Sequence, residues 1–349
     1  MTEPITRLNA MRSTLGRMAG LCVLLAACGG EDAVERPAAA AEVDAEAVAA
    51  AEAGARGLDH IRFLSADSLE GRLIGSEGNR KARDYIEGVY RSLALSMYEG
   101  TYLDPFAFQV NGETREGSNV VGYVEGTEQP DRFIVVTAHF DHLGVRDGEI
   151  YNGADDNASG TAALLEAAAA FAALDVPPAR SVVFLAVSGE EKGLLGSEYY
   201  SENSTVPLEG IIMNINLDMV GRSHPDTVIG IGRQYTNLGA LTDRILREHP
   251  DLGFTLIEDP VPEEQGFFRS DHLNFVNKDI PAIFFSAGFD HEDYHKPSDE
   301  FELIDMDKTA RVSRMVFYLG ALIAGGTVDP EWTEDGLAEV RKTIAERGN

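Results

Sequence analysis

The chain has 349 residues, of which 44% are hydrophobic and 25% are charged, a globular composition that suits one large or two ordinary domains. It contains 58 acidic and 29 basic residues, so its formal net charge is −29. A surface this acidic repels phosphate backbones, which argues against nucleic acid as a partner, and it attracts metal ions and protonated amines.

The first 27 residues have the layout of a bacterial signal peptide. Arg7, Arg12 and Arg17 form a basic region, and the apolar run MAGLCVLLAAC follows at 18–28. This run is too short to span a bilayer as a mature helix. It ends in LLAAC, which resembles a lipobox, in which the cysteine is lipidated and becomes the first residue. We predict a lipoprotein signal peptide over 1–27, with an ordinary signal peptide and a chance cysteine as the alternative.

A lipid on Cys28 would be the only attachment of the chain to a membrane. The residue after Cys28 is Gly29, whereas an aspartate at that position is often linked to inner-membrane retention. We therefore expect the protein in the cell envelope, anchored to the outer membrane and facing the periplasm. The other cysteine, Cys22, lies in the segment that would be removed. The mature chain would therefore have no disulfide, no cysteine nucleophile and no cysteine metal site.

Composition divides the rest of the chain into three parts. Residues 28–54 are rich in Ala, Glu and Asp and bury too little apolar surface to fold alone, so we predict an acidic tether. The folded domain is predicted over 55–325, and a C-terminal helical extension over 326–349.

Within the domain, apolar runs alternate with helical stretches. Four runs are continuously apolar, as expected for strands buried on both faces: 133–138, 182–187, 211–217 and 282–287. Helices are predicted at 159–174, 237–248 and 307–324. This alternation indicates a three-layer α/β/α sandwich with a mostly parallel or mixed central sheet.

Metal-binding side chains follow each of the four runs. The carboxyl ends of strands in an open α/β sheet meet at one edge, where ligands bind. The residues expected at that edge are His139, Glu190, Glu191, Asp218 and His295, with Asp155 and Asp156 on the loop before helix 159–174. His and carboxylate ligands without cysteine suit a hydrolytic zinc site. They exceed the needs of one ion, so we expect two Zn²⁺ ions that share a carboxylate.

These residues lie in segments that resemble the M28 family of co-catalytic zinc aminopeptidases. In chain order the segments are SLEGRLIGSEGNRKARDYI, AHFDHLG, NGADDNASGTAALLE, SGEEKGLLGS, NLDMVGR, RSDHLNF and YHKPSD. They cover roughly 67–299, so the resemblance implies that the domain over 55–325 is a zinc peptidase domain of the zinc-dependent exopeptidase type.

The resemblance also implies a role for each residue. His139 and Asp218 would bind one zinc, Glu191 and His295 the other, and Asp156 would bridge the two, with a cis peptide bond after it. Three residues would assist catalysis: Asp141 by fixing the imidazole of His139, Glu190 as the general base, and Tyr294 by stabilising the oxyanion.

The implied activity is hydrolysis of N-terminal residues from peptides that carry a free N-terminus. A bridging water would be activated by two zinc ions and deprotonated by Glu190. The alternatives are a carboxypeptidase of the same fold, a single-zinc glutaminyl cyclase, and an inactive receptor-like binding protein. The preferred N-terminal residue and the oligomeric state do not follow from the sequence.

Other polar residues receive structural interpretations. His142 is expected behind the ligands or on the surface, with a ligand role as the alternative, and Asp155 is expected to accept backbone N–H bonds rather than to bind metal. Residues 269–272 form either a substrate-side segment or a purely structural one. Trp332 is expected to anchor the C-terminal helix. No partners are evident for three further histidines, His224, His249 and His291.

Overall fold

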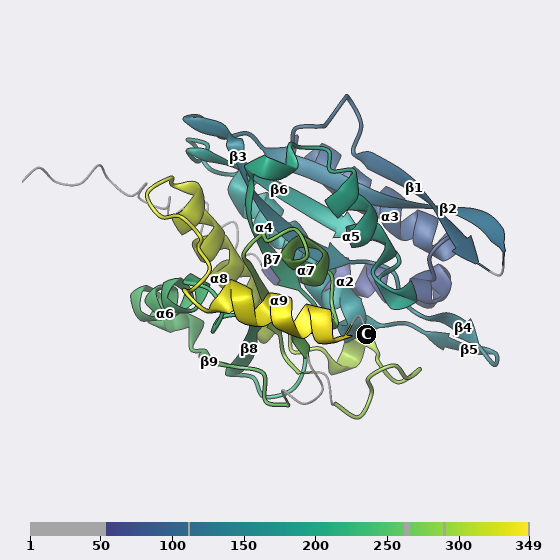
Figure 1. Cartoon of the computed structure of the whole chain (residues 1–349). Helices are drawn as coiled ribbons and strands as arrows, with labels where there is room; N and C mark the ends of the chain where they lie inside the picture. The colour runs from purple at the N-terminus through teal and green to yellow at the C-terminus, as the bar shows by residue number, and fades with distance from the viewer. Residues whose placement is uncertain (1–53, 111, 262–265, 289–290, 348–349) are drawn as a thin grey trace, which may run out of the picture. The chain divides into compact units, whose positions relative to one another are not determined.

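An eight-stranded mixed sheet forms the centre of the part of the chain that the structure describes, and it confirms the predicted α/β architecture (Figure 1). The structure is a computed structural model that describes residues 54–110, 112–261, 266–288 and 291–347. All of them belong to one compact unit, Ala39–Asn349. The predicted signal peptide, the lipid anchor at Cys28 and nearly all of the tether lie outside the described residues, and the predicted domain boundaries stay predictions.

The sheet has the strand order β1-β2-β6-β3-β7-β10-β8-β9. The central strands β6, β3, β7 and β10 are parallel to one another, while β1, β2 and β8 run antiparallel to their inner neighbours. The strands are β1 (Leu103–Val110), β2 (Glu113–Val124), β3 (Gln129–His139), β6 (Arg180–Val187), β7 (Ile211–Leu217), β8 (Thr227–Ile231), β9 (Thr255–Ile257) and β10 (Ala282–Ser286). A small hairpin of β4 (Gly144–Arg146) and β5 (Glu149–Tyr151) stands apart.

Helices cover both faces of this sheet. The α-helices are α2 (Gly54–Leu64), α3 (Glu77–Ser92), α4 (Gly160–Ala172), α5 (Leu195–Glu202), α6 (Leu238–Glu248), α7 (His272–Val276), α8 (Met306–Ala324) and α9 (Gly336–Arg347). Short turns include η1 (Asp67–Arg72), η2 (Ala154–Ser159) and η3 (Glu190–Lys192). Within the described ranges, no helix is both long enough and apolar enough to cross a bilayer.

Successive side chains of a strand point to opposite faces of the sheet, so they pack into separate hydrophobic cores on the two faces. Ile134 and Val136 of β3 point into the core shared with α4 and α8, whereas Val135 points to the opposite core, where Tyr200 of α5 and Phe275 of α7 pack. α9 packs beside β8 and β10 through Val340. The molecule therefore has three layers, as predicted.

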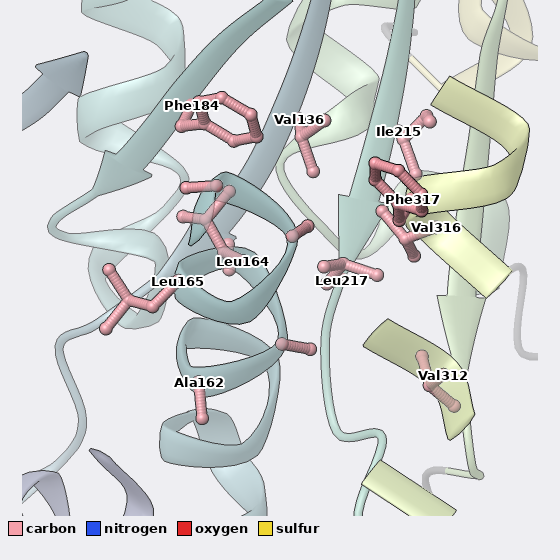
Figure 2. Close-up of a cluster of buried hydrophobic side chains, with 14 of the residues drawn as sticks. Val136, Ala162, Leu164, Leu165, Phe184, Ile215, Leu217, Val312, Val316 and Phe317 are labelled. Carbon is pink, nitrogen blue, oxygen red and sulfur yellow. The ribbon is translucent and has the colours of Figure 1, made fainter. Parts of the chain in front are cut away.

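α4 is the best-buried helix near the site. Every residue from Gly160 to Phe171 is buried, because α2 and α8 cover the side that does not face the sheet. Its alanines let the neighbouring helices approach closely, and Leu164 packs with Val136 and Phe184 of the strands (Figure 2). This packing gives the loop in front of α4 a rigid support.

Candidate metal centre

The parallel register brings the predicted ligands to one edge of the sheet. His139 at the end of β3 lies level with Val187 at the end of β6, and Thr137 lies level with Asn216 of β7. Glu190 and Glu191 follow β6 in η3, and Asp218 directly follows β7. Asp156 reaches the same edge from η2, which leads into α4.

Three of the predicted ligands form a buried group. Nε2 of His139 lies 3.2 Å from Oδ1 of Asp218 and 3.4 Å from Oδ1 of Asp156. All three residues are buried, and their ligand atoms lie close enough together to hold one ion. This is the set predicted for the first zinc.

A second group uses the other oxygen of Asp156. Nε2 of His295 lies 3.1 Å from Oδ2 of Asp156 and 3.4 Å from Oε2 of Glu191. Nδ1 of His142 lies 2.7 Å from Oε1 of Glu191, and His142, Asp156 and Glu191 also meet the geometry for holding an ion. The His142 side chain is fully buried, which excludes the surface position considered for it, whereas 38% of the His295 side chain is exposed.

Zinc fits these residues on two observations. Two side chains beside these groups, Asp141 and His142, each have a buried polar atom, Oδ2 and Nε2 respectively, that no hydrogen bond satisfies within the described residues. Buried polar groups normally have partners, so unsatisfied atoms in a His/carboxylate cluster suit a bound cation. Asp156 also offers one oxygen to each group, as a bridging ligand would.

The pKa values show how strongly this cluster favours positive charge. Burial lowers the pKa of His295, but its hydrogen bonds to Asp156 and Glu191 outweigh that effect and raise it to about 10. Burial and the nearby charge of Glu191 raise the pKa of Asp156. Carboxylates that repel one another in a dry site are stabilised by a cation between them.

The predicted catalytic residues surround these groups. Burial raises the pKa of Glu190 well above its usual value, and nearby Asp218 and Asp271 add to the effect. Asp141 accepts a bond from the Glu190 backbone N–H at 3.2 Å. Nδ1 of His139 lies 3.2 Å from the Asp141 carbonyl oxygen and 3.7 Å from its carboxylate, so the carbonyl is the nearer of the two groups that orient the ring. Tyr294 stacks on His295.

Backbone bonds hold the Asp156 loop in place. The Asp156–Asn157 peptide bond is cis, as the resemblance implied. Asp299, which was not singled out from the sequence, accepts the N–H groups of both Asp155 and Asp156 at 3.0 Å. Asp155 itself accepts from the Gly221 N–H at 2.7 Å, which ties this loop to the one after Asp218. Asp299 lies in YHKPSD, but a bond to backbone N–H groups leaves no sequence pattern.

The three histidines without evident partners have partners in the structure. Nε2 of His291 lies 3.2 Å from Oδ2 of Asp155, so this contact joins the segment before His295 to the Asp156 loop. His249 stacks on Tyr318, and Nδ1 of His224 accepts from a backbone N–H. The partners of His291 and His249 come from distant segments, which no local pattern indicates, whereas the partner of His224 is the backbone of Asp226, two residues further on.

The segment at 269–272 is partly structural. Ser270 donates to Oδ2 of Asp218 at 2.8 Å and thus touches a predicted ligand. Asp271 accepts from Ser197 at 2.6 Å. Nε1 of Trp332 donates to the Asp279 carbonyl, and its ring packs in the cluster that contains Val340 of α9.

Comparison with known proteins places this geometry in context. The chain is 34% identical over 206 residues to a probable zinc metalloprotease of Leptosphaeria maculans, which covers 55% of the chain and 46% of that protein. It is 30% identical over 207 residues to aminopeptidase YwaD of Bacillus subtilis (57% and 43%) and 30% identical over 228 residues to a glutamate carboxypeptidase 2 homolog of Caenorhabditis elegans (56% and 28%). The chain spans less than half the length of each of these relatives.

Solved structures share the fold at low identity. A zinc aminopeptidase from Bacillus subtilis matches with a TM-score of 0.63 and 16% identity over 76% of this chain and 94% of that one. A glutaminyl cyclase from Porphyromonas gingivalis matches with a TM-score of 0.61 and 18% identity over 76% and 97%.

The model of Peptidase family M28 matches residues 119–320, which is more than half of the chain and contains every predicted metal ligand. The chain therefore belongs to peptidase family M28.

Proposed function

We propose that this M28 metallopeptidase is an aminopeptidase that binds two zinc ions through His139, Asp218, Glu191 and His295, with Asp156 as the shared ligand. One observation carries the proposal: the two oxygens of Asp156 face opposite partners. Oδ1 lies 3.4 Å from His139, and Oδ2 lies 3.1 Å from His295. A carboxylate placed between two ligand sets is the arrangement that a pair of ions requires.

The protein's own residues then divide the chemistry. When bound, zinc supplies Lewis-acid polarisation of the scissile carbonyl and lowers the pKa of a coordinated water. Glu190 accepts the proton of the attacking water and passes it to the leaving amine. Asp141 orients the imidazole of His139, and the Tyr294 hydroxyl donates a hydrogen bond to the oxyanion.

The acidic character of the whole chain supports N-terminal cleavage. Its formal net charge is −29, so the field around the protein favours cations. A protonated α-amine of a peptide would be attracted to the same field, whereas a C-terminal carboxylate would be repelled. Aminopeptidase YwaD is among the relatives, but so is a carboxypeptidase 2 homolog, so the choice between them belongs to experiment.

The test combines substrates and metal counting on the purified full-length chain. We expect hydrolysis of aminoacyl-nitroanilides, none of N-blocked peptides with free C-termini, no cyclisation of glutaminyl peptides, and a zinc content near two per chain. Asp156→Asn should lower occupancy at both sites, while His139→Ala and Glu191→Ala should each impair mainly one. Full activity at one zinc per chain would refute the two-metal proposal.

A further inference from the structure

Arg72 is a fully buried cation whose four hydrogen bonds all end on backbone carbonyl oxygens. Its exposed fraction is 0%. Nε donates to Phe140 at 2.8 Å, Nη2 donates to Gly153 at 3.0 Å, and Nη1 donates to Asn152 at 2.5 Å and also to Leu64. Removing a guanidinium from water costs free energy, and here the hydrogen bonds that offset this cost all come from backbone carbonyls. This arrangement indicates that Arg72 has a specific structural role.

Three of the four carbonyls, those of Phe140, Asn152 and Gly153, belong to the two loops that carry predicted ligands, and the fourth, that of Leu64, ends α2. Phe140 lies between His139 and Asp141, and Gly153 lies three residues before Asp156. A guanidinium is planar and holds its donors at fixed angles, so a single side chain that bonds both loops fixes their spacing. Gly153 has a φ of 57°, a left-handed conformation in which its carbonyl is aimed at Nη2.

A third ligand-bearing loop is connected through the backbone of the same residue. The Arg72 carbonyl accepts from Nδ2 of Asn79 at 3.1 Å. Oδ1 of Asn79 in turn accepts from Ser188 at 3.2 Å, two residues before Glu190. Asn79 is itself buried, so this link is shielded from water.

The backbone of residues 70–72, which places Arg72 in this position, has an unfavourable conformation. Glu70, Gly71 and Arg72 all have left-handed φ values of 48°, 66° and 49°. This conformation is unfavourable for residues that carry a side chain, such as Glu70 and Arg72. A Cβ on Gly71 would meet the Tyr151 carbonyl oxygen at 2.4 Å and the Gly144 carbonyl oxygen at 2.7 Å, so the turn is wedged against the hairpin.

We propose that Arg72 is a positioning residue that holds the His139 loop and the Asp156 loop at the separation required for metal binding. This inference rests on the proposed metal centre and deepens it. The charge of Arg72 contributes as well. Burial lowers its pKa to about 10, with Asp141 and Asp156 opposing the shift, so it remains a cation at neutral pH that offsets the repulsion among the carboxylates.

Arg180 provides a matched control in the same fold. It is 3% exposed, and its guanidinium also donates to backbone carbonyls, those of Ile323, Val328 and Gly326, as well as to the side chains of Gln129 and Asp329. It begins β6, whereas Glu190 and Glu191 follow the other end of that strand. Replacing either arginine removes a buried guanidinium that donates to backbone carbonyls. Of the two, only Arg72 contacts the loops that carry the predicted metal ligands.

The experiment compares wild type, Arg72→Lys and Arg180→Lys by zinc dissociation constants from chelator competition and by melting temperatures of the metal-free proteins. We expect both variants to melt lower, and only Arg72→Lys to bind zinc about 10–100-fold more weakly, as for other residues that orient ligands. Equal zinc affinity in Arg72→Lys and wild type would overturn the inference. Failure of wild type to bind zinc would overturn the proposed function and this inference with it.

A second variant decides the matter if Arg72→Lys does not fold. Asn79→Ala keeps the guanidinium and cuts only the link from Arg72 to Ser188. We expect weaker zinc binding in the same direction but by a smaller factor. An unchanged zinc affinity in folded Asn79→Ala would then contradict the positioning role.

Discussion

Glu190 and Glu191 are neighbours in sequence that face different partners. Glu191 contacts His142 and His295, and these bonds, against the effect of burial, hold its pKa well below the usual range. Burial raises the pKa of Glu190. The two carboxyl groups therefore lie in different surroundings, in line with the different roles proposed for them.

This difference predicts opposite outcomes for two matched substitutions. Glu190→Gln keeps the shape but removes the proton acceptor, so it should retain both zinc ions while kcat falls by about 10²–10⁴-fold. Glu191→Gln should lose metal instead. Zinc content and steady-state kinetics of both variants check this. Loss of zinc from Glu190→Gln with retention in Glu191→Gln would reverse the assignment.

Asp104 of β1 is a buried carboxylate away from the metal centre. Burial raises its pKa to about 6, although Nδ2 of Asn119 donates to it at 3.1 Å. A raised folded-state pKa means that the protonated form is preferred in the fold. Its stability contribution is therefore present below the ordinary pKa of about 4 and is lost as pH rises through about 6.

Asp104→Asn should remove this pH dependence, because the amide oxygen still accepts from Asn119 and carries no charge. We expect the variant to be more stable than wild type at pH 8 by about 1–3 kcal/mol, and the gain to vanish near pH 4. Thermal unfolding across this range measures it. Asp175→Asn, at an exposed position, is the control and should change little. A gain that is constant with pH would contradict the buried-carboxylate explanation.

At the scale of elements, the junction of η2 and α4 depends on close approach. A Cβ on Gly160 would lie 2.2 Å from Oδ1 of Asn157 and 2.6 Å from the Leu217 carbonyl oxygen. Asn157 follows Asp156, the proposed shared ligand, and Leu217 precedes Asp218, another predicted ligand. Any side chain at 160 would therefore press on two ligand-bearing segments at once.

Two identical substitutions in two helices test this. Gly160→Ala should destabilise the fold, because the clashing atoms belong to buried groups that cannot move freely. Gly88→Ala in α3 adds a Cβ that meets nothing within 4 Å, so it should stabilise the protein by about 0.5–1 kcal/mol through helix propensity. Chemical denaturation of both variants gives the comparison. Equal stabilisation by both would show that the junction has room.

Elements differed in how well the sequence predicted them. The central strands were found because burial on both faces makes them continuously apolar, as in β6, where every residue is buried. β1 alternates buried and exposed residues and includes Pro105, so its antiparallel position at the sheet edge was not predicted. β8 and β9 are short and were also missed.

At the scale of the whole molecule, the sequence predicted the side chains of the site better than their supports. The predicted ligands are chemically distinctive, and most of them follow apolar strands, so the sequence indicated that they would lie close together. Arg72 and Asp299 were missed because they act on backbone carbonyls and N–H groups of distant loops. Such groups are present in every residue, so no sequence pattern marks which ones will be bonded.

The strands that present the ligands are contiguous in the sheet but remote along the chain. β6, β3, β7 and β10 are neighbours, and Ile134 of β3 pairs with Met213 of β7. Long-range parallel pairing is slow to form, and the predicted ligands come together only once it is complete. Metal therefore has no assembled site to bind in the early stages of folding. We expect zinc to leave the refolding rate nearly unchanged and to lower the unfolding rate. Bound metal would then increase the kinetic stability of the native state.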